Sequence, residues 1–235
     1  NAFLAMRHGF SCFPSLIMGG NVHGPFYPEK EFMQTEQLDL AESRLVWGPP
    51  GDGAVVAVHG NLSHKADTPI QLLAEAASAR ALQVLSFDLP GHGGRKDEPA
   101  PCRIQVCYPS LGRDGVRQKA LGARGPVRLQ LGACFSLAAY ADEPLEQALF
   151  LSPVLDMRRL IENMMLVGVT QERLCRERAI ETPTGETLYW DYYCYVKEHP
   201  VRRWDTPTSI LCGGRDELCE PDVTARFARQ YGCSC

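Results

Sequence analysis

Residues 128–142 (RLQLGACFSLAAYAD) join a short β-type run to an apolar helical run across a Gly-Ala turn. The first residues predict a strand buried in a sheet, and the alanine-rich remainder predicts a helix that begins directly after it. A sharp strand-to-helix turn exposes the side chain at the turn above the edge of the sheet. This stretch therefore predicts an α/β architecture, and it raises the question of which residue in it does chemistry.

The segments before this stretch predict a parallel sheet. Residues 54–60 (AVVAVHG) form a continuous apolar run, which is typical of a strand covered on both faces. Residues 68–81 (TPIQLLAEAASARA) have helical apolar spacing, with Thr68 as the expected N-cap. Residues 82–95 (LQVLSFDLPGHGGR) predict a second strand that ends at Asp88, followed by a loop rich in Gly and Pro. Together they make a βαβ unit, whose two strands lie parallel in one sheet.

Two further buried strands are predicted at 147–157 and 207–217, which gives a mostly parallel sheet flanked by helices. Between them, residues of about 157–204 carry a helical pattern of their own. Side chains at the carboxyl ends of parallel strands meet at one edge, so an insertion at that edge is predicted to be a helical lid. Its large apolar side chains either line an acyl pocket or form a core, and they are Met164, Met165, Trp190, Tyr192, Tyr193 and Tyr195.

Composition narrows the possible functions. The 235 residues are 45% hydrophobic with a net charge of −4, which predicts one globular domain. Because the chain begins without Met and the run after Met33 is typical of a first pair of strands, the domain is expected over 33–235, with 1–32 as a non-native or disordered extension. Charges of both signs are interspersed, so no nucleic-acid partner is expected. No apolar run in the sequence is long enough for a membrane span, so none is expected. Ten scattered cysteines predict reduced, mostly buried thiols and a cytoplasmic location. No cofactor or metal motif is present, so none is expected, and the pattern leaves the oligomeric state open.

The arrangement resembles the α/β-hydrolase fold from about Met33 to the end of the chain. The motifs that carry the resemblance are VHGN at 58–61, DLPGHG at 88–93, the strand-turn-helix at 128–141 and GGRDE at 213–217. Within that fold, the runs LSFDLPGHGGRK, LFLSPVLDM and YWDYYCYVKEHP are similar to a group of small bacterial α/β-hydrolases. The resemblance implies acyl transfer to a nucleophile at the elbow, with a histidine held by a late acid and a small-molecule acyl substrate.

The resemblance assigns most of the site. Asp216, just past the strand SILCGG, takes the place of the acid. His59, Gly60 and Asn61 form the expected oxyanion loop, and His92 is expected to brace the loop that follows the next strand. The fold places the catalytic histidine after the acid, but all histidines of this chain precede it, at positions 8, 23, 59, 64, 92 and 199. The sequence is therefore expected to stop before its final strand and helix.

The nucleophile has two interpretations. Local chemistry favours Cys134, because Gly132 to Ser136 form a G-x-C-x-S elbow with a thiol at its centre. The bacterial group instead aligns its serine with Gln130, which cannot attack an acyl carbon. The glycine- and arginine-rich run before it disfavours the helix expected there, and this leads to the hypothesis that residues 108–130 come from a shifted reading frame. If Cys134 is not the nucleophile, it is a buried cysteine at a helix start. Ser136 lies further into the helix and is expected to face the sheet or a neighbouring element.

Two functions remain open from the sequence. The first is hydrolysis of carboxylic esters, thioesters or related acyl compounds by nucleophile-histidine-acid chemistry in the complete parent protein. The second is a non-catalytic α/β-hydrolase-like binding protein or an inactive fragment, because the fold alone does not confer an activity.

Overall fold

A computed structural model of the chain describes residues 33–34, 44–49, 53–61, 63–98, 103–104, 107, 127–130, 133–166, 168–183, 185–213 and 220–235. For 33–34 and 127–130 it describes the backbone alone. The predicted extension at 1–32, residues 108–126 of the proposed frameshift and the predicted acid Asp216 lie outside the described residues.

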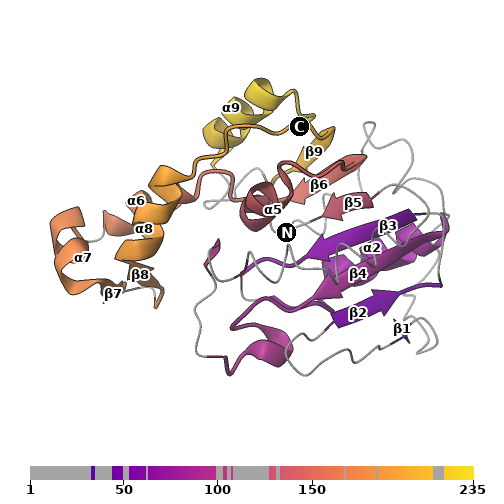
Figure 1. The fold of residues 1–235 in the computed structure, drawn as a ribbon, viewed down its shortest axis with the longest axis horizontal. Helices are drawn as coiled ribbons and strands as arrows, with labels where there is room; N and C mark the ends of the chain where they lie inside the picture. The colour runs from indigo at the N-terminus through magenta and orange to yellow at the C-terminus, as the bar shows by residue number, and fades with distance from the viewer. Residues whose placement is uncertain are drawn as a thin grey trace.

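The described residues form a mixed sheet whose centre is parallel (Figure 1). The strand order is β1 (Met33–Gln34), β2 (Arg44–Trp47), β4 (Leu82–Phe87), β3 (Gly53–Val58), β5 (Val127–Gln130), β6 (Gln147–Leu151) and β9 (Thr208–Leu211). Strands β1 and β2 are antiparallel to their neighbours, and the others run parallel. The predicted α/β class with a mostly parallel sheet is confirmed.

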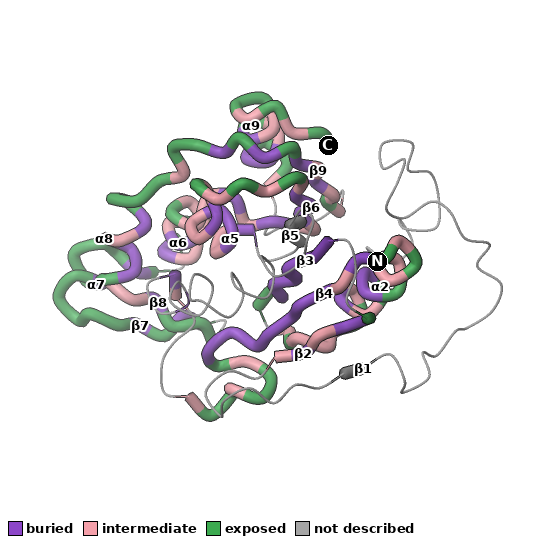
Figure 2. Tube along the Cα trace, turned by 45° about the vertical axis from the view of Figure 1, so that its right-hand side comes forward, coloured by how far each residue is buried: buried purple, intermediate pink, exposed green. Residues whose placement is uncertain are grey.

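Helices cover both faces of this sheet, so the central strands are buried on two sides. All residues of β3 are buried, which agrees with its continuous apolar run (Figure 2). Val55 and Ala57 pack on the face covered by α2 (Thr68–Ser78). Val56 and Val58 pack on the opposite face with α5 (Ala133–Tyr140) and α9 (Pro221–Tyr231). The alternation follows from the two-residue period of a strand.

The start of α2 differs from the prediction. Asp67 is the N-cap, and its carboxylate accepts from the Thr68 N–H at 2.8 Å. Thr68 is already helical, and the proline after it stands in the first turn, where its missing N–H costs no hydrogen bond. The expected Thr68 cap is therefore wrong by one position, because an aspartate immediately before the helix supplies the acceptor.

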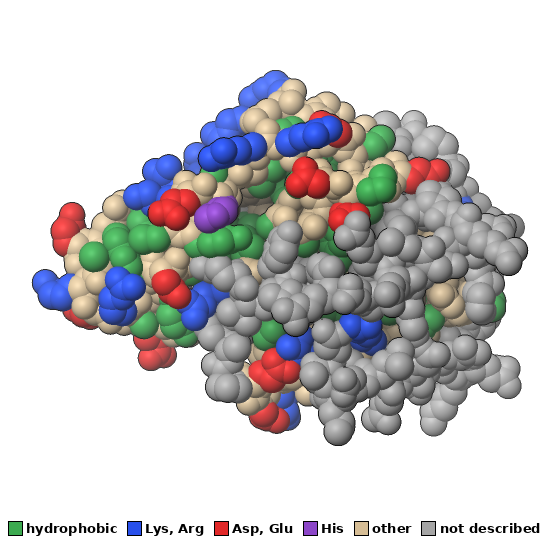
Figure 3. Space-filling model, viewed as in Figure 1, with side chains coloured by type: hydrophobic (Ala, Val, Ile, Leu, Met, Phe, Trp, Pro, Cys, Tyr) green, Lys and Arg blue, Asp and Glu red, His purple; other side chains and the backbone are tan. Residues whose placement is uncertain are grey.

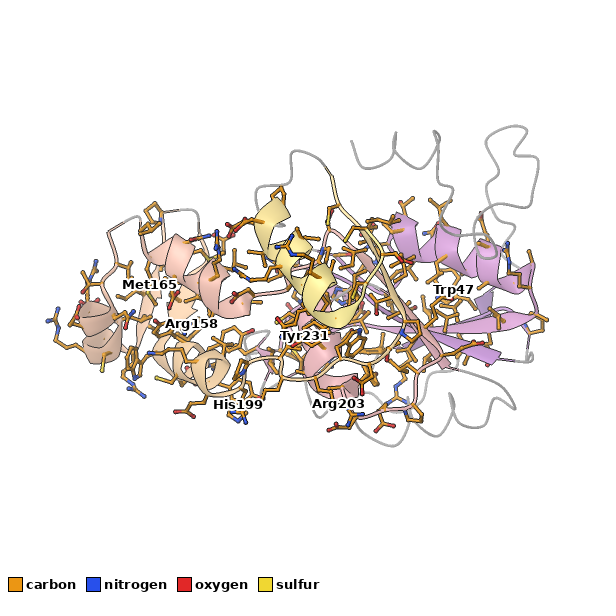
Figure 4. All side chains as sticks on the ribbon, turned by 90° about the horizontal axis from the view of Figure 1, so that it is seen from above. Trp47, Arg158, Met165, His199, Arg203 and Tyr231 are labelled. Atoms are coloured by element: carbon orange, nitrogen blue, oxygen red, sulfur yellow. The ribbon has the colours of Figure 1, made fainter. Side chains whose placement is uncertain are left out.

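The segment between β6 and β9 folds around a core of its own. It contains α6 (Met157–Met165), α7 (Gln171–Glu177), the hairpin β7 (Ala179–Glu181) with β8 (Thr187–Tyr189), and α8 (Trp190–Glu198). These elements project to one side of the sheet in Figure 1. Figure 4, seen from above, places Met165 in this insertion and Trp47 in the sheet at opposite ends of the molecule. The insertion matches the predicted segment, and its role as a lid stays a prediction.

Predicted cysteine burial is wrong for most of the thiols that the structure describes. Of the seven described cysteines, Cys107 alone is fully buried. Cys175 is exposed on α7, and Cys212 and Cys235 are exposed at the end of β9 and of the chain. Apolar sequence neighbours did not predict burial here, because each of these three positions lies on a helix surface or beyond the end of a strand.

The last residues of the chain lie beside β9. Ser234 forms a parallel bridge with Ser209. The Ser234 N–H donates to the Thr208 carbonyl at 2.9 Å, and the Ile210 N–H donates to the Ser234 carbonyl at 2.8 Å. Gly232, with φ of +68°, ends α9 and turns the chain toward this strand.

Candidate active site

The carboxyl ends of β3, β4 and β5 lie level with one another. Val58 pairs with Phe87, and Ala57 pairs with Gln130. The loops that leave these ends hold most of the predicted site: 59–61 after β3, the loop that begins at 88 after β4, and the start of α5 after β5. Parallel strands thus bring three separate segments to one edge of the sheet, the usual place for a ligand in this class of fold.

His59 is buried and held in one tautomer. Its Nε2 accepts from the Leu89 N–H at 2.9 Å, and its Nδ1 lies 2.8 Å from the Gly60 carbonyl oxygen. A backbone N–H can only donate and a carbonyl can only accept, so Nδ1 carries the proton. Burial lowers the pKa of His59, and its bond to the Gly60 carbonyl offsets that only in part. The ring is therefore a neutral anchor between two loops.

This anchor orients the peptide between Gly60 and Asn61. In a trans peptide the carbonyl and the N–H point in opposite directions, so the Asn61 N–H points away from His59. Among the described residues this N–H has no protein acceptor, and Asn61 is exposed. A Cβ at Gly60 would meet no atom within 4 Å. Within the described part of the chain, the loop thus presents an unbonded backbone donor at the edge where the strands end.

Asp88 ties the loop after β3 to the loop after β4. Its Oδ1 accepts from the Lys65 N–H and its Oδ2 from the Gly94 N–H, each at 2.8 Å, and it forms an ion pair with the Lys65 ammonium. The carboxylate is fully buried. Burial by itself would raise the pKa of Asp88, but the bonds from Lys65 and Gly94 outweigh it and the pKa is lowered.

The same loop is supported from within the sheet. The Ser86 hydroxyl donates to the Lys65 carbonyl at 2.7 Å. The Trp47 indole Nε1 donates to the Ser86 oxygen at 2.8 Å, and both of these side chains are buried. This chain of bonds from β2 through β4 fixes the backbone at Lys65, and the Asp88 pair then fixes its side chain.

His92 belongs to the loop after β4 and contacts the loop after β3. Its ring centroid is 5.0 Å from that of His59. Nδ1 lies 3.0 Å from the Pro90 carbonyl oxygen, and Nε2 lies 3.3 Å from Asn61 Oδ1. The histidine expected to brace this loop therefore contacts the loop after β3 as well.

Cys134 is the second residue of α5 and is partly exposed. Its side chain packs at the border of the insertion's core. Burial, with a smaller contribution from the negative charge of Asp156, raises the pKa of its thiol to about 12. Among the described residues, no hydrogen bond joins Cys134 to a histidine. Ser136 is fully buried, as its position in the helix predicts.

The structure describes the residues on either side of the predicted elbow. Strand β5 ends at Gln130 and α5 begins at Ala133, and residues 131–132 between them lie outside the described residues. Gln130 thus belongs to the strand. The structure brings His59, Gly60 and Asn61 to the edge where α5 starts, and it leaves Asp216 unplaced.

The apolar side chains predicted for the insertion divide into two groups. Met165, Tyr192 and Tyr193 are buried in the insertion's own core. Met164, Trp190 and Tyr195 pack around it and are partly buried. Half of the set is therefore core, and the partly buried half shares its surroundings with Cys134 and Phe135 of α5.

Arg103 links the insertion to the segment that follows β4. Arg103 Nη1 donates to the Asp191 carboxylate, at 2.6 Å to Oδ1, and its guanidinium lies 4.4 Å from the Tyr189 ring centroid. Ile104, next to it, is buried in the insertion's core. Residues 103–104 thus hold the start of α8 to the segment that follows β4.

The described part of the chain shows neither a metal site nor a membrane-spanning helix. No three His, Cys, Asp or Glu side chains there are grouped as a metal site. No helix among these residues is both long and apolar enough to cross a membrane. The face in Figure 3 shows basic and acidic side chains together over the insertion and α9. Within the insertion, Arg158 forms an ion pair with Glu162.

This combination of sheet order, a helix that follows β5 and loops gathered at one edge is that of the α/β-hydrolase fold, and the chain has this fold. Solved structures agree over most of its length. Est1E from Butyrivibrio proteoclasticus, solved with ferulic acid bound, is 17% identical, with a TM-score of 0.67 over 82% of this chain and 83% of that one. Alpha/beta hydrolase domain-containing protein 10 from mouse is 13% identical, with a TM-score of 0.65 over 85% and 84%.

A third similar structure comes from an archaeon. An esterase from Pyrococcus furiosus is 13% identical, with a TM-score of 0.62 over 92% of this chain and 85% of that one. No family model and no curated protein matches the sequence. The resemblance inferred from the sequence motifs is thereby confirmed at the level of the fold.

Proposed function

We propose that the protein hydrolyses small carboxylic esters or thioesters. The observation that carries the proposal is the Asn61 N–H, which has no acceptor among the described residues and which the neutral His59 anchor directs away from its own ring at the carboxyl edge of the sheet. A backbone N–H held in a fixed orientation stabilises the oxyanion of a tetrahedral intermediate by donating a hydrogen bond to it. Similar structures support the acyl chemistry, since they include an esterase from Pyrococcus furiosus, a thioesterase domain from the curacin pathway and a monoacylglycerol lipase from Paleococcus ferrophilus.

In the proposed reaction, Cys134 Sγ attacks the carbonyl carbon as a thiolate and its proton goes to solvent. The carbonyl oxygen becomes an oxyanion that accepts from the Asn61 N–H. The intermediate collapses, the alcohol or thiol leaves with a proton, and water then hydrolyses the thioester formed on Cys134. Asp216 remains the acid that the resemblance implies, whose role in the nucleophile-histidine-acid scheme of the complete parent protein is to hold the histidine. The insertion at 157–204 remains the proposed lid. Cytoplasmic location, bacterial origin and a small-molecule acyl partner likewise stay predictions.

Activity that depends on Cys134 is expected to rise with pH. A thiol with a pKa of about 12 is almost entirely protonated at neutral pH, and its ionised fraction grows about tenfold for each pH unit below that value. We therefore expect the hydrolysis rate to increase about tenfold per unit between pH 7 and pH 9. The measurement is initial rate against pH, corrected for hydrolysis in buffer. A plateau near pH 7 would show that another nucleophile acts.

The direct test is turnover of p-nitrophenyl butyrate and of a short acyl thioester by the full chain. Cys134→Ala is expected to remove the enzymatic rate, whereas Cys175→Ala, at an exposed cysteine on α7, is expected to keep it. Equal rates in the two variants would exclude Cys134. If the wild-type chain turns over neither substrate but a short fatty acid still raises its melting temperature, the non-catalytic binding alternative is favoured.

His59→Phe tests the anchor separately. The variant loses both the donor to the Gly60 carbonyl and the acceptor for the Leu89 N–H. With the Asn61 peptide no longer held, we expect kcat to fall about tenfold, with a smaller change in KM. Circular dichroism at the assay temperature checks that the variant is folded. An unchanged kcat in a folded variant would remove the oxyanion role of this loop.

A further inference from the structure

The contacts of His92 cannot both be ordinary hydrogen bonds when its ring is neutral. Both ring nitrogens face oxygen atoms, Nδ1 the Pro90 carbonyl at 3.0 Å and Nε2 the Asn61 Oδ1 at 3.3 Å. A neutral imidazole carries one N–H, whereas the charged ring carries two. The arrangement of two acceptors therefore fits the charged ring.

Loss of a proton has a defined consequence. The Pro90 carbonyl can only accept, so the neutral ring keeps its proton on Nδ1, and Nε2 becomes an acceptor. Asn61 Oδ1 then faces a lone pair. Rotation of the Asn61 amide by half a turn removes this conflict, because Nδ2 can donate to Nε2. The two ends of an Asn amide have nearly the same shape, so the exchange needs no change in the backbone.

We infer that His92 is a positioning residue whose protonation decides which end of the Asn61 side-chain amide faces outward at the candidate site. With the charged ring, Oδ1 is held inward and Nδ2 points outward as a donor near the free Asn61 N–H. With the neutral ring, Nδ2 is held inward and Oδ1 points outward as an acceptor. The inference rests on the proposed function, since a donor favours an oxyanion at this position and an acceptor disfavours it.

Among the described ionisable side chains of these two loops, His92 is the one whose ring contacts the Asn61 side-chain amide. His59 is buried and its pKa is lowered, so it stays neutral. Asp88 and Lys65 neutralise one another. The other titratable or charged groups among residues 59–65 and 88–98, which carry these two loops, are His59, His64, Lys65, Asp88, Arg95, Lys96, Asp97 and Glu98. His92 itself is partly exposed, and histidine is the side chain that ordinarily titrates between about pH 5 and pH 8.

The test that needs no activity is nuclear magnetic resonance of the ¹⁵N-labelled full chain between pH 5 and pH 8. We expect the Asn61 side-chain amide signals to shift with the same midpoint as the His92 ring nitrogens. The shift should vanish in His92→Phe. It should persist in His199→Gln, where the lost ring lies in the insertion and bonds the Tyr195 carbonyl at 2.9 Å (Figure 4). Asn61 signals that ignore the His92 titration would overturn the inference.

The kinetic test uses the ratio of kcat at pH 5.5 and pH 8, after division by the same ratio for Asn61→Ala, which keeps the backbone N–H and His92. We expect kcat at pH 5.5 relative to kcat at pH 8 to be about tenfold higher in the wild-type chain than in Asn61→Ala. The expected effect is smaller than the loss on removing a buried oxyanion donor, because Asn61 is exposed. Equal ratios would overturn the inference even if hydrolysis itself is confirmed. If the chain hydrolyses no ester, the proposed function fails, while the resonance experiment still decides whether His92 positions Asn61.

Discussion

Replacing Gly93 with alanine is expected to lower the free energy of unfolding by about 4 kcal/mol. Gly93 has a φ of +53°, in the left-handed region, where a side chain costs about 1 kcal/mol or more. A Cβ there would also lie 2.3 Å from Asp88 Oδ1. This carboxylate cannot turn aside cheaply, because it is fully buried and held by Lys65 and Gly94. The clash therefore adds about 3 kcal/mol, as for an overpacked core.

The measurement is urea unfolding followed by circular dichroism, with Gly232→Ala as the matched control. Gly232 also has positive φ, +68°, but a Cβ there meets no atom within 4 Å. The control variant should therefore lose about 1 kcal/mol, the backbone cost alone. In thermal melts the difference between the variants should be on the order of 10 °C. Similar losses in both variants would mean that the Asp88 carboxylate is free to move.

The sheet could be predicted from sequence because its central strands are buried on both faces. Continuous apolar runs are unambiguous where each is followed by a Gly- or Pro-rich loop, as at 54–60 and 82–95. Helix boundaries were less certain, and the Thr68 cap was misplaced because two adjacent residues can both cap a helix. The position of His59, Gly60 and Asn61 also followed from the sequence, because the end of a parallel strand determines it.

The support of the site could not be predicted in the same way. Lys65 pairs with Asp88 across 23 residues of sequence, and a lone lysine in a polar loop carries no signal of burial. The pKa of Cys134 depends on how the insertion packs over α5, which no spacing reveals. His92 was expected as a brace, but its two opposed acceptors exist only once both loops are folded. Pairings across loops are long-range properties of the fold.

Lys65→Met is expected to lower the free energy of unfolding by about 3 kcal/mol at pH 7. In the wild-type chain the pKa of Asp88 is lowered, so this carboxylate contributes stability above its unfolded pKa, and that contribution is lost as the pH falls through the folded value. Without the Lys65 ammonium, the fully buried carboxylate keeps its two N–H donors but loses its counter-charge. Desolvation then dominates, and we expect the pKa of Asp88 to rise above its unfolded value.

The pH dependence of the loss distinguishes this cause from lost packing. Because Asp88 in Lys65→Met can relieve its burial by taking up a proton, the difference from the wild-type chain should shrink to about 1 kcal/mol near pH 4. Urea unfolding at pH 7 and pH 4 measures it, with Lys96→Met, an exposed lysine on the neighbouring loop, as the control. A loss that is equal at both pH values would show that Lys65 acts through its hydrocarbon stem. A loss that shrinks on acidification shows that the two loops carrying the candidate site are joined by charge, since Asp88 is the group that holds them together.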